Sequence, residues 1–354
     1  MSGATARPLA GSLTAADIES VPEAVVTRIR EARRVLTVCH ENPESDALGS
    51  ALATALLVEE LGGQATPVCG DPVPPMYRFM PGIERFRLEP DPGIDYDLIV
   101  VGDCGELERV GPLLESHRGL FDRVPIVDID HHKSNPGFGA VDWIDAEAAA
   151  TCEMVTLLAI RLGVPLTAAD GALATALMAG VVIDTANFQH PNVTPRTLRV
   201  AAELVAAGAP LADIARRLYR TKPNPQLKLF GLVLGRMESA HEGRLVWSRL
   251  NDEDLVTARA KPSDSEGLID LLSQSETADI VLLFKEHGEG ATRVSVRTRE
   301  GGVDATELTG TFGGGGHARA AGATVERPLA EAEPLVLAEA ERLLEKLDRD
   351  GSRG

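Results

Sequence analysis

The sequence is short of cations relative to its acidic residues. Its 354 residues include 35 Lys and Arg against 53 Asp and Glu, which gives a formal net charge of −18. A protein that tracks a long phosphate backbone needs a basic surface, so this charge argues against a long nucleic acid as a partner. Any nucleic acid substrate is therefore expected to be small.

Long apolar segments and paired cysteines are also missing. No stretch reaches the roughly 18 uninterrupted apolar residues of a membrane span, and the N-terminus has no apolar core of signal-peptide length. The four cysteines, at positions 39, 69, 104 and 152, form no Cys-x-x-Cys pair, which is typical of reduced, buried thiols. These features predict a cytoplasmic protein with no membrane partner.

The length and the order of the sequence patterns predict two domains. A chain of 354 residues with 44% hydrophobic and 25% charged residues is longer than an ordinary single domain. Strand patterns alternate with helical patterns, which predicts an α/β fold with a doubly wound parallel sheet, followed by a smaller α/β domain. We expect disorder at 1–16 and 348–354, a catalytic domain at 17–208, a linker at 209–225 and a substrate-binding domain at 226–347.

Imidazole and carboxylate side chains follow four apolar stretches of the sequence, VLTV, DLIVV, PIVDI and ALMAGVVI. The residues that follow them are, in chain order, His40, Glu44, Asp46, Asp103, Asp130, His131, His132 and Asp184. The carboxyl ends of parallel strands meet at one edge of an open α/β sheet, and that edge usually holds the active site. We therefore expect these side chains to converge.

The chemistry of these donors favours a hard divalent cation. So many carboxylates would repel one another unless a cation lay among them. Oxygen and imidazole donors without thiolate suit Mn²⁺ or Mg²⁺ better than structural Zn²⁺. About five carboxylates and three histidines suffice for two metal ions roughly 3.5–4 Å apart, which clamp the attacking and leaving oxygens in phosphoryl hydrolysis. The residues thus predict a two-metal phosphoesterase.

The second predicted domain contains a glycine run before a histidine, preceded by a strand pattern with an arginine. Glycines let backbone N–H groups approach an anion with no Cβ in the way, and a guanidinium fork suits phosphate. The residues expected to bind a phosphate or a terminal nucleotide are Ser295, Arg297, Gly314, Gly315, Gly316 and His317. The alternative interpretation is a flexible loop beside a solvated arginine.

At these residues the chain resembles the DHH phosphoesterases. HENPESDALGS, VVGDCG, VDIDHHKSNPGFG and GVVIDTANF are similar to the family motifs in order, and FGGGGHARAAGA is similar to the signature of the associated C-terminal domain. The combination resembles the oligoribonuclease and pAp phosphatase branch. This resemblance implies hydrolysis of very short RNAs, of linear or cyclic dinucleotides to 5′-mononucleotides, or of 3′-phosphoadenosine 5′-phosphate (pAp) to AMP.

The resemblance also implies a role for each residue. The implied ligands are His40, Glu44 and Asp103 for one Mn²⁺, and Asp46, Asp103, His131 and Asp184 for the other, with Mg²⁺ as an alternative ion. Asp130 would orient His131, and His132 would face the scissile phosphate while a water activated by both metals attacks it. Glu44 departs from the family, which usually has Asp there; we expect a shifted metal position rather than a lost site.

Other functions stay open at this point. Related inorganic pyrophosphatases share the metal motifs but carry basic residues in place of GGGGH. A single-strand exonuclease would need a basic channel, against which the net charge of −18 argues. A noncatalytic nucleotide sensor would retain binding with a metal site weakened at Glu44. The sequence does not decide among the short substrates, nor between a monomer and a homodimer.

Overall fold

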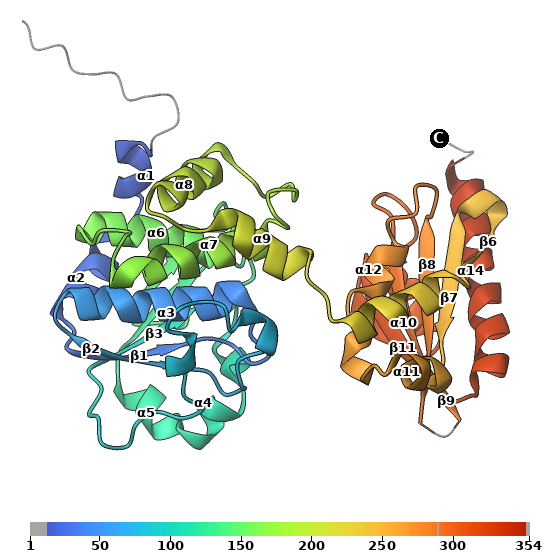
Figure 1. The fold of residues 1–354 in the computed structure, drawn as a ribbon, viewed down its shortest axis with the longest axis horizontal. Helices are drawn as coiled ribbons and strands as arrows, with labels where there is room; N and C mark the ends of the chain where they lie inside the picture. The colour runs from blue at the N-terminus through green and yellow to red at the C-terminus, as the bar shows by residue number, and fades with distance from the viewer. Residues whose placement is uncertain (1–12, 289, 352–354) are drawn as a thin grey trace, which may run out of the picture. The chain divides into compact units, whose positions relative to one another are not determined.

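The computed structural model describes residues 13–288 and 290–351 and divides into two compact units (Figure 1). The first unit is Met1–Thr221 and the second is Lys222–Gly354. Within the described ranges, no helix is both long and apolar enough to cross a membrane. The disorder expected at residues 1–12 and 352–354 lies outside the described residues.

The first unit is built on a five-stranded parallel sheet with the strand order β2-β1-β3-β4-β5. The strands are β1 (Arg34–Val38), β2 (Gln64–Val68), β3 (Leu98–Gly102), β4 (Ile126–Asp130) and β5 (Val141–Ile144). Every residue of β3 and β4 is buried, as expected for strands covered on both faces. The predicted doubly wound parallel sheet is confirmed.

Helices cover both faces of this sheet (Figure 1). One face carries α2 (Glu23–Glu31), α3 (Ser45–Glu60), α6 (Thr151–Leu162) and α7 (Ala172–Asp184), and the other carries α4 (Pro112–Ser116) and α5 (Arg118–Arg123). The unit also contains α1 (Ala15–Glu19), α8 (Pro195–Ala206), α9 (Leu211–Tyr219) and 3₁₀ turns at Pro75–Tyr77, Ile83–Arg85, Leu107–Val110 and Ala169–Gly171. Residues 15 and 16 are thus helical, although we expected disorder there.

Helices α3 and α7 approach each other closely because glycines lie between them. A Cβ at Gly49 of α3 would lie 2.6 Å from the backbone oxygen of Ala176, and a Cβ at Gly180 of α7 would lie 2.4 Å from Asp46 Oδ1. Both helices are buried over most of their length. This packing brings the start of α3, with Asp46, to the end of α7, with Asp184.

The connection between the units differs from the linker expected at 209–225. Helix α9 occupies most of that stretch, and its Ile214 and Leu218 are buried in the same core as α7. The clustered charges that suggested a linker lie on the more exposed side of this amphipathic helix, at Asp213, Arg216 and Arg217. The units divide between Thr221 and Lys222, and a helix of the second unit already begins at residue 224.

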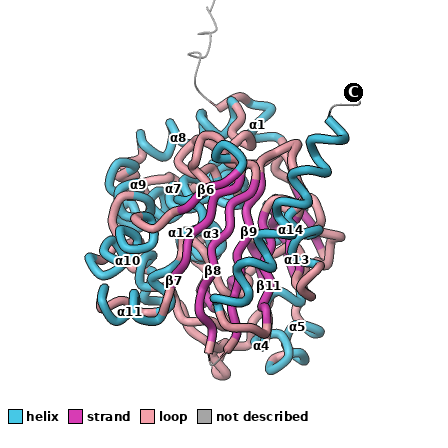
Figure 2. The backbone as a smooth tube through the Cα atoms, turned by 90° about the vertical axis from the view of Figure 1, so that its right-hand side faces the viewer, coloured by secondary structure: helices cyan, strands magenta, loops and turns pink. Residues whose placement is uncertain are grey.

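The second unit contains a mixed six-stranded sheet with the order β10-β11-β9-β8-β7-β6 (Figure 2). The strands are β6 (Glu238–Ala240), β7 (Leu245–Leu250), β8 (Ile280–His287), β9 (Ala291–Thr298), β10 (Gly315–His317) and β11 (Ala320–Val325). Only β7 and β8 pair in parallel. This confirms the second, smaller α/β domain.

Helices also cover the two faces of this second sheet. One face packs on α10 (Asn224–Leu234), α11 (Asp252–Ala258) and α12 (Leu268–Leu272), and the other on α13 (Ala305–Gly310) and α14 (Leu329–Gly351). Short 3₁₀ turns lie at His241–Gly243 and Pro262–Ser265. Because α14 continues to Gly351, residues 348–351 are helical, which corrects the disordered tail expected from residue 348.

Gly49→Ala should destabilise the protein even though alanine is the better helix former. Its Cβ would lie 2.6 Å from the backbone oxygen of Ala176, and overpacking of this kind costs about 1–3 kcal/mol. Gly231→Ala on α10 is the matched control, since nothing lies within 4 Å of its Cβ and stability should rise by about 0.5–1 kcal/mol. Denaturant unfolding measures both variants, and effects of the same sign would contradict the packing argument.

Candidate functional site

The residues expected to bind metal lie at the carboxyl edge of the first sheet and at two helix ends. His40 and Asp103 follow β1 and β3, and His131 follows β4. Asp46 lies in the first turn of α3, and Asp184 is the last residue of α7. The convergence at the edge of a parallel sheet therefore involves two helices as well as the strand ends.

These side chains form overlapping groups that all contain Asp103. Within each group, one ligand atom per residue lies within 4.8 Å of the others. The groups are His40, Glu44 and Asp103; Asp46, Asp103, His131 and Asp184; and Asp103, His131 and His132. The structure thus brings together every residue that the sequence analysis named as a metal ligand.

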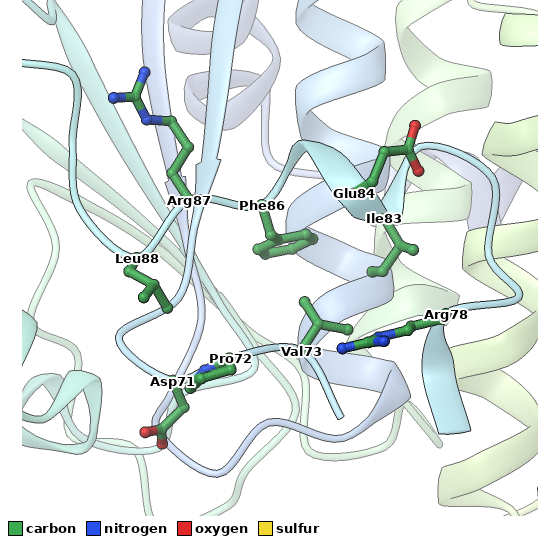
Figure 3. Close-up of a pocket in the computed structure, with 9 residues that line it drawn as sticks. All are labelled: Asp71, Pro72, Val73, Arg78, Ile83, Glu84, Phe86, Arg87 and Leu88. Atoms are coloured by element: carbon green, nitrogen blue, oxygen red, sulfur yellow. The ribbon is translucent and has the colours of Figure 1, made fainter. Parts of the chain in front are cut away.

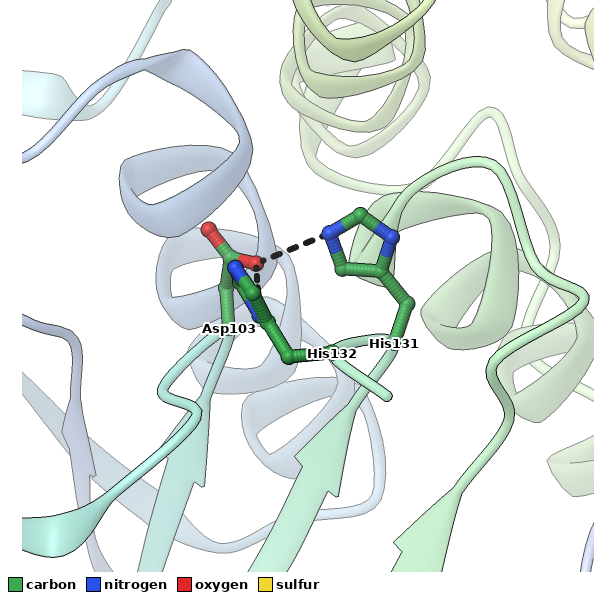
Figure 4. A group of neighbouring side chains, drawn as sticks. All are labelled: Asp103, His131 and His132. Atoms are coloured by element: carbon green, nitrogen blue, oxygen red, sulfur yellow. Dashed lines mark ion pairs between the residues drawn. The ribbon is translucent and has the colours of Figure 1, made fainter. Parts of the chain in front are cut away.

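Asp103 lies at the centre of the arrangement. Its Oδ2 is 3.7 Å from His40 Nε2. Its Oδ1 is 3.4 Å from His131 Nε2 and 3.7 Å from His132 Nδ1, the two contacts drawn in Figure 4. The hydroxyl of Thr151 donates to the same Oδ1 at 3.2 Å. The residue has φ of 57°, a left-handed conformation that is uncommon outside glycine and that often occurs at functional sites. One carboxylate therefore takes part in all three groups.

Backbone carbonyl groups determine which nitrogen of two histidines can bind a metal. His40 Nδ1 lies 2.6 Å from the carbonyl oxygen of Glu41, and His131 Nδ1 lies 3.3 Å from that of Ala148. A carbonyl oxygen can only accept a hydrogen bond, so Nδ1 carries the proton in each neutral ring. Nε2, which faces Asp103 in both residues, keeps its lone pair for a metal ion.

Asp46 is held by the N-terminus of α6, a contact that the sequence analysis missed. Its carboxylate accepts hydrogen bonds from the backbone N–H of Thr151 at 2.6 Å and of Cys152 at 2.9 Å. Helix N-termini favour negative charge, so this contact orients Asp46 and offsets part of the cost of burying it. No sequence signal pointed to this contact, because the helical pattern was expected to begin at Glu147 and residue 46 is 105 positions from residue 151.

Nearby, Glu153 is fully buried and pairs with Arg196 Nε at 2.6 Å. Its other oxygen accepts from the backbone N–H of Ala149 at 3.3 Å. Glu153 therefore joins α6 to α8 and to the loop before α6, and it does not belong to any of the metal-binding groups.

The expectation that Asp130 orients His131 is wrong. Asp130 Oδ1 lies 2.7 Å from His132 Nδ1, while its Oδ2 accepts from Asn135 Nδ2 at 2.8 Å. Alternate residues of an extended chain point to the same side, so residue 130 faces residue 132 rather than its neighbour. Asn135 also donates to Asp128 Oδ2 at 2.9 Å. This asparagine follows the Asp-His-His string by three residues and was missed.

Mutual electrostatic effects shift the protonation of the cluster. Burial alone would lower the pKa of His40 and His131, but ion pairs with Asp103 outweigh it and raise these pKa values to about 10 and about 12. Burial raises the pKa of Asp46 and of Asp184, and the charge of Asp103 raises both further. Protons held by the histidines thus offset the negative charge of the carboxylates, a charge that a divalent cation would offset if one were bound.

Glu44 fits a role as a metal ligand despite its extra methylene. Its Oε1 accepts from the backbone N–H of Ala47 at 3.0 Å, capping α3, and lies 3.8 Å from His40 Nε2. Its Oε2 is buried without a hydrogen-bond partner within the described part of the chain. A buried oxygen of this kind is costly unless a cation or donor occupies the space beside it. The residues present therefore fit a hard divalent ion.

A cavity of ≈ 580 Å³ lies beside the loop that carries His40 (Figure 3). Val73, Ile83 and Phe86 supply apolar side chains to its wall, together with Arg78. It contains none of the metal-binding groups. Asp71, which lines the cavity, accepts a hydrogen bond at 2.7 Å from the backbone N–H of Asn42, in the loop that carries His40.

The substrate residues expected in the second unit lie on three neighbouring strands. Ser295 and Arg297 lie on β9, opposite Gly322 and Ala320 of β11. Strand β11 pairs in turn with β10, which contains Gly315, Gly316 and His317, and Gly314 directly precedes it. Arg297 also pairs with Asp270 of α12, at 2.9 Å.

Two of the expected phosphate-binding glycines are required by strand packing. A Cβ at Gly314 would lie 2.3 Å from the backbone oxygen of Gly322, and one at Gly316 would lie 2.6 Å from that of Ala320. Gly315, in contrast, has nothing within 4 Å of its Cβ position. Close approach of β10 to β11 thus explains Gly314 and Gly316, and Gly315 is the glycine whose missing side chain leaves space open.

Comparison with known proteins agrees with this architecture. Residues 34–181 match the N-terminal domain of the DHH family, and residues 251–346 match the DHHA1 domain. The chain is 35% identical over 288 residues to the bifunctional oligoribonuclease and PAP phosphatase NrnA of Thermus thermophilus, covering 81% of this chain and 82% of that protein. This chain belongs to the DHH family.

Further relatives support the DHH assignment. The protein of the same name from Bacillus subtilis is 26% identical over 303 residues, covering 84% of this chain and 92% of that protein. An exopolyphosphatase-related protein from Bacteroides fragilis has the same fold, with a TM-score of 0.78 at 22% identity over 94% of this chain and 98% of that chain. The resemblance to the DHH oligoribonuclease and pAp phosphatase type is confirmed, and with it the expectation of a phosphoesterase.

Binding of Mn²⁺ to this DHH protein should release protons and tighten as pH rises. His40 and His131 have raised pKa values, so below those values each must lose a proton before its Nε2 can bind metal. Calorimetry on chelator-treated protein should show an affinity gain of roughly tenfold per pH unit for each proton displaced. His287→Ala, in the second unit, is the control and should change nothing. Affinity that is independent of pH would contradict this account of the cluster.

Proposed function

We propose that this protein is a Mn²⁺-dependent phosphodiesterase and phosphatase. Its substrates would be very short oligoribonucleotides or dinucleotides, cleaved to 5′-mononucleotides, and pAp, cleaved to AMP. The single observation that carries the proposal is the buried carboxylate of Asp103, which faces two groups of hard ligands at once. Relatives whose names include both activities support the substrate class, and the net charge of −18 favours short substrates.

The ligand groups suggest how two ions would be held. One Mn²⁺ would take His40, Glu44 and Asp103, and the second would take Asp46, Asp103, His131 and Asp184, with Mg²⁺ as the alternative. When bound, such ions supply Lewis acidity and lower the pKa of a coordinated water towards neutrality. Thr151 holds Asp103 through its hydroxyl, at 3.2 Å, and so keeps that carboxylate directed at both groups.

His132 is the side chain we assign to the phosphate. Its hydrogen bond to Asp130, at 2.7 Å, raises its pKa and favours the protonated ring. A positively charged imidazole can stabilise negative charge on a phosphate oxygen or donate a proton to the leaving oxygen. The His132 side chain is 35% exposed and that of His131 only 16%, so His132 is the more accessible to a substrate.

In the second unit, we assign Ser295, Arg297, Gly315 and His317 to a terminal phosphate or nucleotide of the substrate. Arg297 offers guanidinium donors beyond the Nε that pairs with Asp270. Gly315 leaves the surface of β10 open. Asp270 would compete with the phosphate for this arginine, so the site is expected to bind with modest affinity.

His131→Ala and His132→Ala should separate metal binding from phosphate contact. Loss of His131 Nε2, which lies 3.2 Å from Asp184, should lower both metal occupancy and turnover. Loss of His132 should leave two metals bound while kcat falls roughly 100- to 1000-fold, because only transition-state stabilisation is removed. Metal analysis and steady-state kinetics measure both. Equal loss of metal in the two variants would refute the division of roles.

A substrate length series tests the proposed function itself. With Mn²⁺ fixed, kcat/KM should be highest on dinucleotides and the shortest oligoribonucleotides and should fall as nucleotides are added, because an acidic surface gives little grip on further phosphates. Products should be 5′-mononucleotides, with AMP from pAp. Rates that rise with strand length would indicate an exonuclease, turnover of pyrophosphate alone a pyrophosphatase, and binding without turnover a sensor.

A further inference from the structure

A half-buried lysine in the second unit pairs with no carboxylate of the described residues. Lys285 lies on β8, and its Nζ donates to the hydroxyl of Ser265 at 2.9 Å. That hydroxyl donates in turn to the backbone oxygen of Pro262, at 2.8 Å, so it offers the ammonium group one neutral acceptor. Across residues 13–288 and 290–351, no carboxylate forms an ion pair with Lys285. A cation removed from water in this way is unfavourable unless an anion compensates it.

A second unpaired cation lies directly across the sheet. Strands β8 and β9 are antiparallel, and Lys285 is in register with Arg293. Side chains at such positions share a face with their Cβ atoms about 4.5–5.5 Å apart, and like charges there are destabilising. Arg293 is exposed, and no ion pair of this residue occurs in the described part of the unit. The folded unit thus places two positive charges side by side, and no described carboxylate forms an ion pair with either of them.

The neighbouring acids do not neutralise this pair. Asp270 is already hydrogen-bonded to Arg297 Nε, at 2.9 Å, and Glu266 acts on Lys285 only at longer range. Burial lowers the pKa of Lys285, and the charge of Arg293 lowers it further. The lowered pKa agrees with the position of Lys285 opposite Arg293, since both indicate that the ammonium group is in an unfavourable electrostatic environment.

The adjacent strand β11 adds only small, uncharged residues to this face of the sheet, which packs on α12 nearby. Alternate residues of β9 point to the same side, so Arg293, Ser295 and Arg297 line the face that also carries Lys285. Strand β11 places only Thr324, Gly322 and Ala320 beside them, none of which is charged or bulky. The face is therefore a row of donors with small neighbours.

We propose that Lys285 and Arg293 form a subsite for a phosphate group of a bound nucleotide, with Ser265 positioning the ammonium group of Lys285. This subsite is separate from the one assigned to Arg297, because Arg293 lies four residues, roughly 13 Å, away along the strand. The inference rests on the proposed function, since it names a part of the substrate that the second unit holds. The ligand chemistry is a phosphomonoester, either the 5′-terminal phosphate of a short oligonucleotide or the 3′-phosphate of a mononucleotide.

Lys285→Met and Arg293→Gln in the full-length protein test the subsite by binding. With metal ions chelated, adenosine 5′-phosphate, adenosine 3′-phosphate and adenosine are titrated into each protein in a calorimeter. Either variant should weaken at least one phosphate ligand by roughly tenfold or more, through loss of a charge-assisted hydrogen bond, and leave adenosine unchanged. Loss for the 5′-phosphate assigns the subsite to the end of an oligonucleotide, and loss for the 3′-phosphate assigns it to a mononucleotide.

Thermal unfolding shows whether a variant that binds phosphate more weakly has also lost stability. Because Lys285 and Arg293 repel each other in the folded unit, neither substitution should lower Tm, and Lys285→Met should raise it. Arg342→Gln on α14, which packs on the opposite face of the sheet, is the matched control for net charge and should bind all ligands as the wild type does. Unchanged affinity of both variants for both phosphates would overturn the subsite.

Kinetics on the Mn²⁺-loaded protein distinguish this inference from the proposed function. For diadenylate with a 5′-phosphate, Lys285→Met and Arg293→Gln should raise KM with kcat unchanged, while KM for diadenylate without that phosphate should stay the same. A wild-type protein that hydrolyses no short RNA would refute the proposed function and leave the binding result intact. An active wild type with equal KM values in all variants, and equal binding, would refute the subsite alone.

Discussion

Repulsion among buried carboxylates is the constraint on which the rest of the site depends. Asp46, Asp103 and Asp184 lie within a few ångströms of one another, largely removed from water. In the protein alone, the pKa values of His131 and Asp46 are raised, so both groups hold protons more readily and part of this repulsion is relieved. A divalent cation would relieve this repulsion in place of the bound protons. The folded protein therefore already holds the carboxylates where such an ion would bind.

The rigid parts of the first unit keep this unfavourable arrangement in place. Close packing of α3 on α7 through Gly49 and Gly180 fixes the positions of Asp46 and Asp184. The N-terminus of α6 holds Asp46 with two backbone N–H groups, and carbonyl oxygens turn the rings of His40 and His131. His40, Asp46 and His131 are thus oriented by groups outside the cluster, as is usual for metal sites.

The second unit shows the opposite charge imbalance on a smaller scale. Lys285 and Arg293 face each other across β8 and β9, and among the described residues no carboxylate pairs with either, whereas Arg297 on the same face pairs with Asp270. Each of the two clusters by itself suits phosphate chemistry, because basic side chains offer charge-assisted hydrogen bonds to phosphate and hard carboxylate and imidazole ligands suit metal ions. The overall charge of −18 hides this local division.

The sequence by itself determined the α/β class, the two units and the set of histidines and carboxylates that converge, because a parallel sheet brings its strand ends to one edge whatever the details of packing. Only the tertiary structure decided which partner each side chain has. Thr151 holds Asp46 from 105 positions away, Asp130 serves His132, and Gly314 is required by the backbone of β11. Contacts of this kind depend on the packing of distant segments, whereas periodicity in the sequence reports only the local conformation and burial of each segment.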